Sequence, residues 1–145
     1  MTGWEEAALE LLGAYESMRQ SQKNLQEEAS AVSIAGPYGS DRRLDGLARR
    51  RQLQTRAAAC RRVVRQVERG LAVLTPAQRL VVEMLCVRPD KGNVERLCDL
   101  LGCEKSTVYR CRREALKQFG MAVWGTAIEK RGGTRLPRAA MPPSQ

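Results

Sequence analysis

The chain contains 145 residues, the length of one ordinary domain or of two small ones. Its 25 lysines and arginines outnumber its 16 acidic residues, so the formal net charge is +9 and the isoelectric point lies near 9.9, a balance that predicts an acidic polymer as partner. The sequence has no run of about eighteen apolar residues and no signal-peptide pattern, so we expect a cytoplasmic protein with no membrane association.

The absence of histidine and the positions of the five cysteines bear on catalysis and metal binding. No two cysteines form a C-x-x-C pair, and without histidine the spacing does not suit zinc, so we expect no metal and no cofactor. Histidine is also the commonest general base, and no pair of nucleophile and base stands out. The chain is therefore not expected to be an enzyme, and Cys98 and Cys111 are expected to act as small hydrophobes on helix faces.

Residues 1–34 have the periodicity of one long helix, predicted over about residues 3–34. Apolar positions step alternately by four and three residues, which is the seam of a coiled coil. Charge in this segment is mostly negative, with six glutamates against one arginine and one lysine. The seam consists of Leu11, Tyr15, Met18, Gln22, Leu25, Ala29 and Val32.

A breaker at residues 35–40 separates this helix from a second one, predicted over about residues 41–73. Glycine and proline in the string AGPYGSD disfavour a continuous helix, and Ser40 or Asp41 can cap the helix that follows. The second helix contains ten arginines and repeats the alternating steps of four and three. Its seam consists of Leu53, Ala57, Cys60, Val64, Val67, Leu71 and Leu74.

The short connection makes the two long helices natural antiparallel neighbours, with the acidic helix against the basic one. In that register Glu16 lies opposite Arg56, and Glu27 or Glu28 lies near Arg49. Exposed ion pairs contribute roughly 0–1 kcal/mol each, so they select the register more than they stabilise it. Because a two-helix hairpin has a thin core, we expect it to pack on a second copy, as a homodimer, or on the C-terminal domain.

The arginines on the outer face of the second helix have two interpretations. They can follow the phosphates of a nucleic acid, or they can form a solvated coiled-coil face that also attracts the acidic helix. The sequence alone favours the solvated face, although an ordinary solvated face mixes charges of both signs. The arginines concerned are Arg43, Arg50, Arg51, Arg61, Arg62, Arg65 and Arg69.

Three shorter helices are predicted next, at residues 76–87, 94–101 and 104 to about 120. Thr75 and Gln78 have the spacing of a capping box, and a proline occupies the first helical position. Asn93 stands as the N-cap of the middle helix, and Gly102 can take the left-handed conformation that ends it. The expected core of this unit is Leu80, Val81, Met84, Leu85, Val94, Leu97, Leu101, Val108, Ala115, Leu116 and Phe119.

The last two of these helices have the pattern of a helix-turn-helix, and the outer face of the second is cationic. On a helical projection, one arc of about 100° carries Ser106, Tyr109, Arg110, Arg113 and Lys117. A helix in the major groove needs side chains that reach base edges and cations that meet phosphates. The alternative is a solvated basic face, but the preceding turn favours DNA binding.

Residues 74–119 resemble region four of bacterial sigma factors, and more closely the ArpU/RinA-like late-gene transcription regulators of phages. The string STVYR-x-R-x-x-AL at residues 106–116 carries most of the resemblance, with LTPAQR before it. Those proteins also have a long helical hairpin ahead of the helix-turn-helix, interrupted by a loop like AGPYG. The N-terminal likeness is one of pattern alone.

This resemblance implies a sequence-specific activator of phage late genes that binds promoter DNA in a bacterial host cell and contacts RNA polymerase. It places Lys105, Ser106, Tyr109, Arg110 and Arg113 toward the major groove. Arg112 is expected to contact phosphate or to pack on the stem. One departure is Glu104, where such proteins commonly have serine or threonine, because glutamate is a poorer N-cap. The full set of predicted DNA-binding residues is Lys105, Ser106, Thr107, Tyr109, Arg110, Arg112, Arg113 and Lys117.

The sequence thus predicts an all-α protein with a hairpin at residues 1–73, a helix-turn-helix domain at residues 74–124 and a basic, largely disordered tail at residues 125–145. Trp124 is expected to pack onto the three-helix unit or to mark a partner surface. Two alternatives to transcription regulation remain open. One is a DNA-packaging protein like a phage small terminase subunit, and the other is an assembly protein that binds polymerase without reading DNA.

Overall fold

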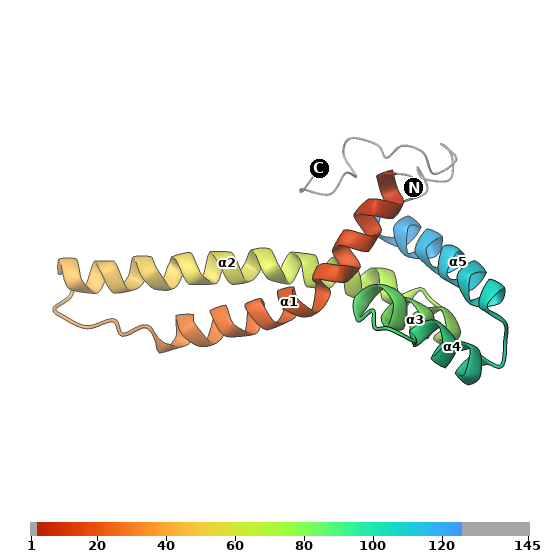
Figure 1. The fold of residues 1–145 in the computed structure, drawn as a ribbon. Helices are drawn as coiled ribbons and strands as arrows, with labels where there is room; N and C mark the ends of the chain where they lie inside the picture. Colours follow the sequence, from red (N-terminus) through yellow and green to blue (C-terminus); the bar gives the residue numbers. More distant parts are fainter. Residues whose placement is uncertain (1–2, 126–145) are drawn as a thin grey trace. The chain divides into compact units, whose positions relative to one another are not determined.

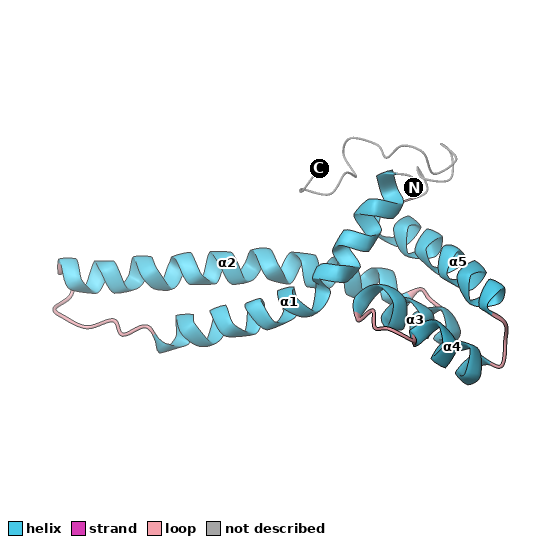
Figure 2. Cartoon of the chain, viewed as in Figure 1, coloured by secondary structure: helices cyan, strands magenta, loops and turns pink. Residues whose placement is uncertain are grey.

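The computed structural model describes residues 3–125, and all regular structure in that range is helical, as Figures 1 and 2 show. The all-α class predicted from the sequence is therefore confirmed. None of the described helices is long and apolar enough to cross a membrane. The elements in chain order are α1 (Gly3–Ala31), α2 (Asp41–Ala72), α3 (Pro76–Val82), the π-helical turn η1 (Glu83–Val87), α4 (Asn93–Leu101) and α5 (Lys105–Trp124). The tail predicted to be disordered lies, apart from Gly125, outside the described residues.

The chain divides into two compact units, one of which is discontinuous in sequence. Residues 16–65 form one unit, and the segments on both sides of them form the other. The sequence placed the division at residue 73, but the first turns of α1 and the last turns of α2 group with the shorter helices. Large buried side chains explain the difference, because both segments carry them. The buried large residues of these two segments are Trp4, Leu11, Leu12, Tyr15, Val67 and Leu71.

Residues 16–65 form a hairpin in which α1 and α2 lie side by side (Figure 1). The helix α1 ends at Ala31, about three residues earlier than predicted, and an irregular segment then lies against α2. Two features favour this early end. Arg50 Nη2 donates to the Val32 carbonyl oxygen over 3.2 Å, and a Cβ at Gly46 would lie 2.8 Å from the Ser33 carbonyl oxygen. The Arg43 N–H donates to Ser40 Oγ over 3.3 Å, so Ser40 caps α2.

The core of the hairpin is as thin as the sequence predicts. Leu53 is fully buried, and the other buried side chains of residues 16–65 are Ala29, Ala57 and Val64. The expected ion pair between Arg49 and Glu28 is present at 3.4 Å, with both side chains more than half exposed. The expected ion pair between Glu16 and Arg56 is not formed, because Arg56 makes no ion pair within the described residues.

The second unit contains α3, α4 and α5, which pack on one another. The capping box at the start of α3 is confirmed, since Gln78 N donates to Thr75 Oγ1 over 3.2 Å and Thr75 N donates to Gln78 Oε1 over 3.1 Å. Trp124 is buried at the end of α5, as one of the two expectations for it requires.

One glycine allows two helices of this unit to approach closely. A Cβ at Gly70 of α2 would overlap the ring of Phe119 and lie 3.0 Å from Val123 Cγ2, both on α5. Phe119 is fully buried and cannot easily move away. Gly70 is therefore the point at which α2 contacts α5.

Candidate nucleic-acid interface

The turn between α4 and α5 consists of residues 102–104 and begins with a left-handed glycine. Gly102 has φ 64° and ψ 40°, a region that L-residues with a Cβ enter at a cost. Its N–H donates to the Cys98 carbonyl oxygen, and so does the N–H of Cys103, over 3.1 Å. These bonds satisfy a carbonyl at the end of α4, so the predicted role of Gly102 as the helix terminator is confirmed.

A small apolar core holds α3, α4 and α5 together beneath this turn. Val81 of α3, Leu97 of α4 and Val108 of α5 are each fully buried at its centre. Because each helix contributes one residue, the orientation of α5 depends on all three. The partly buried side chains around the centre are Leu80, Met84, Leu85, Val94, Cys98, Leu101, Cys103 and Cys111.

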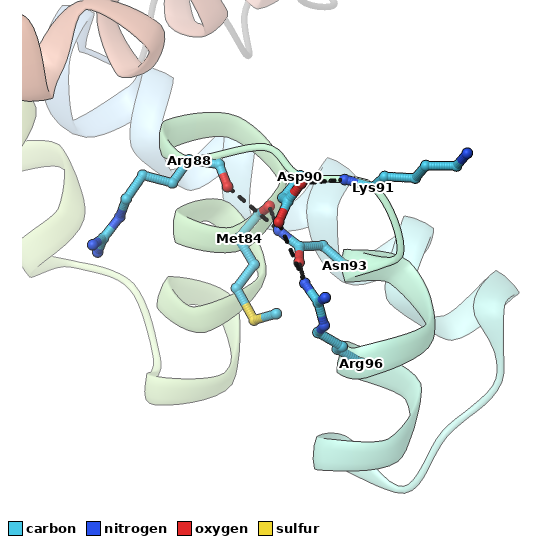
Figure 3. A network of polar contacts seen from close by, with 6 residues as sticks. All are labelled: Met84, Arg88, Asp90, Lys91, Asn93 and Arg96. Carbon is cyan, nitrogen blue, oxygen red and sulfur yellow. Dashed lines mark hydrogen bonds and ion pairs between the residues drawn. The ribbon is translucent and has the colours of Figure 1, made fainter.

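The predicted capping role of Asn93 is wrong. The residue at the N-cap of α4 is Gly92, with φ 84°, and Asn93 is already the first helical residue, with only 5% of its surface exposed. Its side chain instead bridges two helices, because Nδ2 donates to the carbonyl oxygens of Met84 (2.7 Å) and Arg88 (3.3 Å), as Figure 3 shows. Asn93 therefore ties the start of α4 to the π-helical turn.

The π-helical turn explains why these carbonyl groups are available. In η1 the Arg88 N–H donates to the Glu83 carbonyl oxygen, five residues earlier, instead of to Met84 four residues earlier. The Met84 oxygen is thus left for Asn93. Arg96 extends the network, since Nη1 donates to Asn93 Oδ1 over 2.7 Å and lies 3.6 Å from Asp90 Oδ2 (Figure 3).

The outer face of α5 presents the cations and polar groups that the sequence predicts there. Tyr109 is 46% exposed, whereas Val108, Ala115 and Phe119 on the opposite side are fully buried. Lys117 is half-buried, at the edge of the face. The exposed members of the predicted DNA-binding set are Lys105, Ser106, Thr107, Tyr109, Arg110 and Arg113. We call Ser106, Tyr109, Arg110 and Arg113 the recognition face.

Lys105 differs from the other predicted residues because an acidic side chain of α4 holds it. Lys105 Nζ lies 3.3 Å from Glu95 Oε1, and both side chains are mostly exposed. Hydrogen bonds from the backbone N–H of Glu95 itself and from Lys105 lower the pKa of the Glu95 carboxyl. The carboxylate therefore stays charged at neutral pH and competes with any phosphate for Lys105.

The start of α5 matches the expected weakness of Glu104 as a cap. Glu104 is extended, with φ −86° and ψ 164°, and its side chain makes no capping hydrogen bond. Its carbonyl oxygen accepts from the N–H groups of Thr107 and Val108, each over 3.1 Å. The first N–H groups of α5 remain open to an external acceptor, and a helix N-terminus attracts anions, but the Glu104 carboxylate opposes a phosphate there.

Arg112 lies between the core and the exposed face, and it packs on the stem of the unit. Its side chain is half-buried, and its guanidinium lies near enough to the buried Cys86 thiol to act on the pKa of that thiol. Burial raises the pKa of that thiol, and the positive charge of Arg112 offsets part of the increase. Of the two roles expected for Arg112, the structure thus provides the packing contact, and Arg112 does not belong to the recognition face.

The cysteines are free thiols, and three of them surround the turn. Burial raises the pKa of Cys98 and Cys111, and the neighbouring Cys103 raises both further. Within residues 3–125, no three histidine, cysteine or acidic side chains are grouped as a metal ion would require. Cys98, Cys103 and Cys111 pack against the apolar core of the three helices.

Sequence reasoning missed several residues that position the recognition face. The bridging role of Asn93 and the contribution of Arg96 were missed because they depend on the π-helical turn, for which the sequence gives no signal. Cys86 and Val87 of that turn are also buried, which the sequence did not predict. Gly70 had a signal, since a glycine in a helix often marks a close approach, but nothing pointed to α5 as the neighbour.

No protein family model, curated protein or solved structure matches this chain.

Proposed function

We propose that α4 and α5 bind double-stranded DNA, with α5 in the major groove, and that the chain regulates transcription by reading a promoter sequence. The observation that carries this proposal is the recognition face: arginines and hydrogen-bonding groups exposed on one side of α5, while the other side is anchored in the core.

The spacing of the two arginines on this face suits base recognition. Arg110 and Arg113 are three residues apart, about 4.5 Å along the helix axis, which is close to the roughly 3.4 Å rise between base pairs. An arginine guanidinium can donate two hydrogen bonds to guanine, and a Ser106 or Thr107 hydroxyl can pair with several bases. Tyr109 presents a ring and a hydroxyl beside them.

The regulatory role extends the resemblance to sigma region four and to phage late-gene regulators. It assigns promoter binding to the recognition face and proximity to host RNA polymerase to the same unit. The net charge of +9 also favours an acidic polymer as partner. A packaging protein would use the same face on packaging sites, in a ring of many copies, so its mass in solution separates it from a monomeric or dimeric regulator.

The test is selection of bound fragments from fragmented phage and bacterial genomes by the purified protein at about 150 mM salt. The same selection is run with Arg113→Ala, and with Arg79→Ala as a control. Arg79 is an exposed arginine of the same unit, lies on α3 and pairs with Glu83 at 3.1 Å. Both changes remove one positive charge, but only Arg113 belongs to the recognition face.

We expect one motif near promoters for the parent protein and for Arg79→Ala, and loss of that motif for Arg113→Ala. The affinity of Arg113→Ala for the selected site should fall by about 1–3 kcal/mol, with little change on unrelated DNA. An equal loss of affinity for all DNA sequences would show that Arg113 does not read bases. Absence of any motif would reject sequence-specific regulation, and enrichment of packaging sites by a large ring would support the packaging alternative.

A further inference from the structure

The helix α2 contains a stretch in which arginine is the sole charged residue. Between residues 46 and 67 it has seven arginines and no lysine, aspartate or glutamate. Arginine is favoured over lysine at phosphate-binding sites, because its planar guanidinium donates two hydrogen bonds in a fork. A solvated helix face would mix charges of both signs, so this composition needs a physical reason.

The hairpin engages only two of these seven arginines. Arg49 pairs with Glu28, and Arg50 donates to the Val32 carbonyl oxygen. The other five are exposed and make no ion pair within the described residues; they are Arg51, Arg56, Arg61, Arg62 and Arg65. Within residues 3–125, no carboxylate forms an ion pair with any of these five arginines.

Four of the five lie on one side of α2. At 100° per residue, they occupy an arc of about 100° whose centre is about 130° from the fully buried Leu53. We call Arg51, Arg61, Arg62 and Arg65 the arginine face. It covers residues 51–65, or about 21 Å of helix, which matches the rise of about six nucleotides in one DNA strand.

A shallow hollow beside the arginine face extends it toward α1 with uncharged polar groups. Its lining contains Arg61 together with the amides of Gln26 and Gln54 and the hydroxyl of Ser30, and no carboxylate. Amide N–H and hydroxyl groups are common donors to phosphate and sugar oxygens. The lining of this hollow therefore offers donors to an anion and contains no carboxylate that would repel it.

The other flank of α2 is less suitable. Arg42, Arg49 and Arg56 lie within about 40° of one another, next to the buried seam. A hollow lined by Arg49 and Arg56 opens there and extends to Arg51 of the arginine face. The carboxylate of Glu28 already neutralises Arg49 at 3.4 Å, and a phosphate placed there would meet that negative charge. We call Arg42, Arg49 and Arg56 the flanking stripe.

We propose that the arginine face is a second binding site, which takes the phosphate backbone of double-stranded DNA without reading its sequence. The choice of DNA over another polyanion rests on the function proposed for the recognition face. The arginine face would supply affinity through contacts with the DNA backbone, and the recognition face would supply specificity through contacts with bases.

The test compares two variants that remove the same charge from the same helix. Arg51→Gln, Arg62→Gln and Arg65→Gln are combined in the face variant, and Arg42→Gln, Arg49→Gln and Arg56→Gln in the flank variant. Fluorescence anisotropy gives the affinity of the full chain for a labelled duplex of unrelated sequence between 50 and 200 mM KCl. Circular dichroism checks that both variants keep their helices, and glutamine is a good helix former at exposed positions.

The expected result is a weaker salt dependence of the face variant. Each phosphate contact contributes about 0.9 to the slope of log affinity against log salt, so the slope should fall by about 2.7. The loss of affinity between 50 and 200 mM KCl would then be about 40-fold smaller than for the parent protein. The flank variant should keep the slope of the parent within one unit, and a face variant with lysines at the three positions should regain it.

Several outcomes would overturn the proposal. Equal flattening by the face and flank variants would mean that net charge alone matters. A larger loss on duplex RNA, or on vesicles rich in phosphatidylserine, than on DNA would assign the face to a different partner. If fragments are selected through Arg113 but neither variant changes the slope, this inference fails while the proposed function stands. If no motif is selected but the face variant loses its slope, the sequence-reading function fails and this inference stands.

Discussion

Replacing Asn93 with alanine should destabilise the unit that contains the recognition face by about 2 kcal/mol. The change removes the 2.7 Å hydrogen bond from Nδ2 to the Met84 carbonyl oxygen. A typical hydrogen bond contributes about 0.5–1.5 kcal/mol net, and a buried acceptor left without a partner costs about 1–3 kcal/mol. The longer bond to the Arg88 carbonyl oxygen and the one from the exposed Arg96 add less, because water can replace them.

Two further variants make this prediction specific. Asn93→Asp keeps the shape but places an oxygen against two carbonyl oxygens at pH 7, so it should destabilise the unit more than alanine does. Arg96→Ala removes the exposed partner alone and should cost less than about 0.5 kcal/mol. Both tryptophans of the chain are buried in this unit, and the hairpin contains none. Tryptophan fluorescence in urea therefore reports the unfolding of this unit and not that of the hairpin.

A midpoint shift for Asn93→Ala that corresponds to less than about 0.5 kcal/mol would refute the reasoning. It would mean that the contact with the π-helical turn does not hold the start of α4. A smaller effect of aspartate than of alanine would likewise show that the side chain does not face carbonyl groups.

Gly70→Ala should destabilise the same unit by about 1–3 kcal/mol, because the new Cβ overlaps a buried ring of α5, whereas Gly13→Ala meets open space and should stabilise by about 0.5–1 kcal/mol in the same urea assay. Glu95→Gln should raise DNA affinity at low salt by up to about fivefold in a titration, since it frees Lys105; the opposite change would show that the ion pair positions α5. The pKa of Glu95 is lower in the folded chain than in the unfolded chain, so the ionised carboxylate stabilises the fold above the ordinary carboxyl pKa. This stabilisation is lost as the pH falls through the folded-state pKa. The urea midpoint of Glu95→Gln should therefore fall less on acidification than that of the parent protein. Alkylation of Cys86 near pH 8, followed by mass spectrometry, should be much slower in the folded chain than in urea, since burial keeps the thiol protonated; equal rates would contradict its burial beside α5.

The features of the site that the sequence predicted correctly depend on a few neighbouring residues. The left-handed Gly102, the start of α5 within one residue of the predicted position and the burial of Val108 follow from local chemistry and from helical periodicity. The exposure of Arg110 and Arg113 follows from the same periodicity. Binding of DNA by these residues stays a prediction.

The features that the sequence did not predict depend on contacts between distant segments. Asparagine is a residue type common at N-caps. Its bridging role at position 93 arises because the Met84 carbonyl oxygen does not accept the hydrogen bond from the Arg88 N–H that a regular α-helix would provide. The heptad seam of α1 and α2 runs unchanged through both compact units, so the periodicity contained no sign of the division at residues 15 and 65. Lys105 has the pattern of a phosphate contact, and its pairing with Glu95 required the geometry of the turn.

The discontinuous unit makes the hairpin an insertion within a folded domain. Residues 16–65 leave that unit in α1 and return to it in α2, so its folding brings the two ends of the inserted segment together. Closing a flexible segment of this length would cost about 3.5 kcal/mol of chain entropy. Because folding of the discontinuous unit already closes the segment, the thin core around Leu53 need not offset that cost. Stability in either unit is therefore coupled to the other through the chain itself, and loosening the Trp4 end of α1 should also lower the unfolding midpoint of the hairpin.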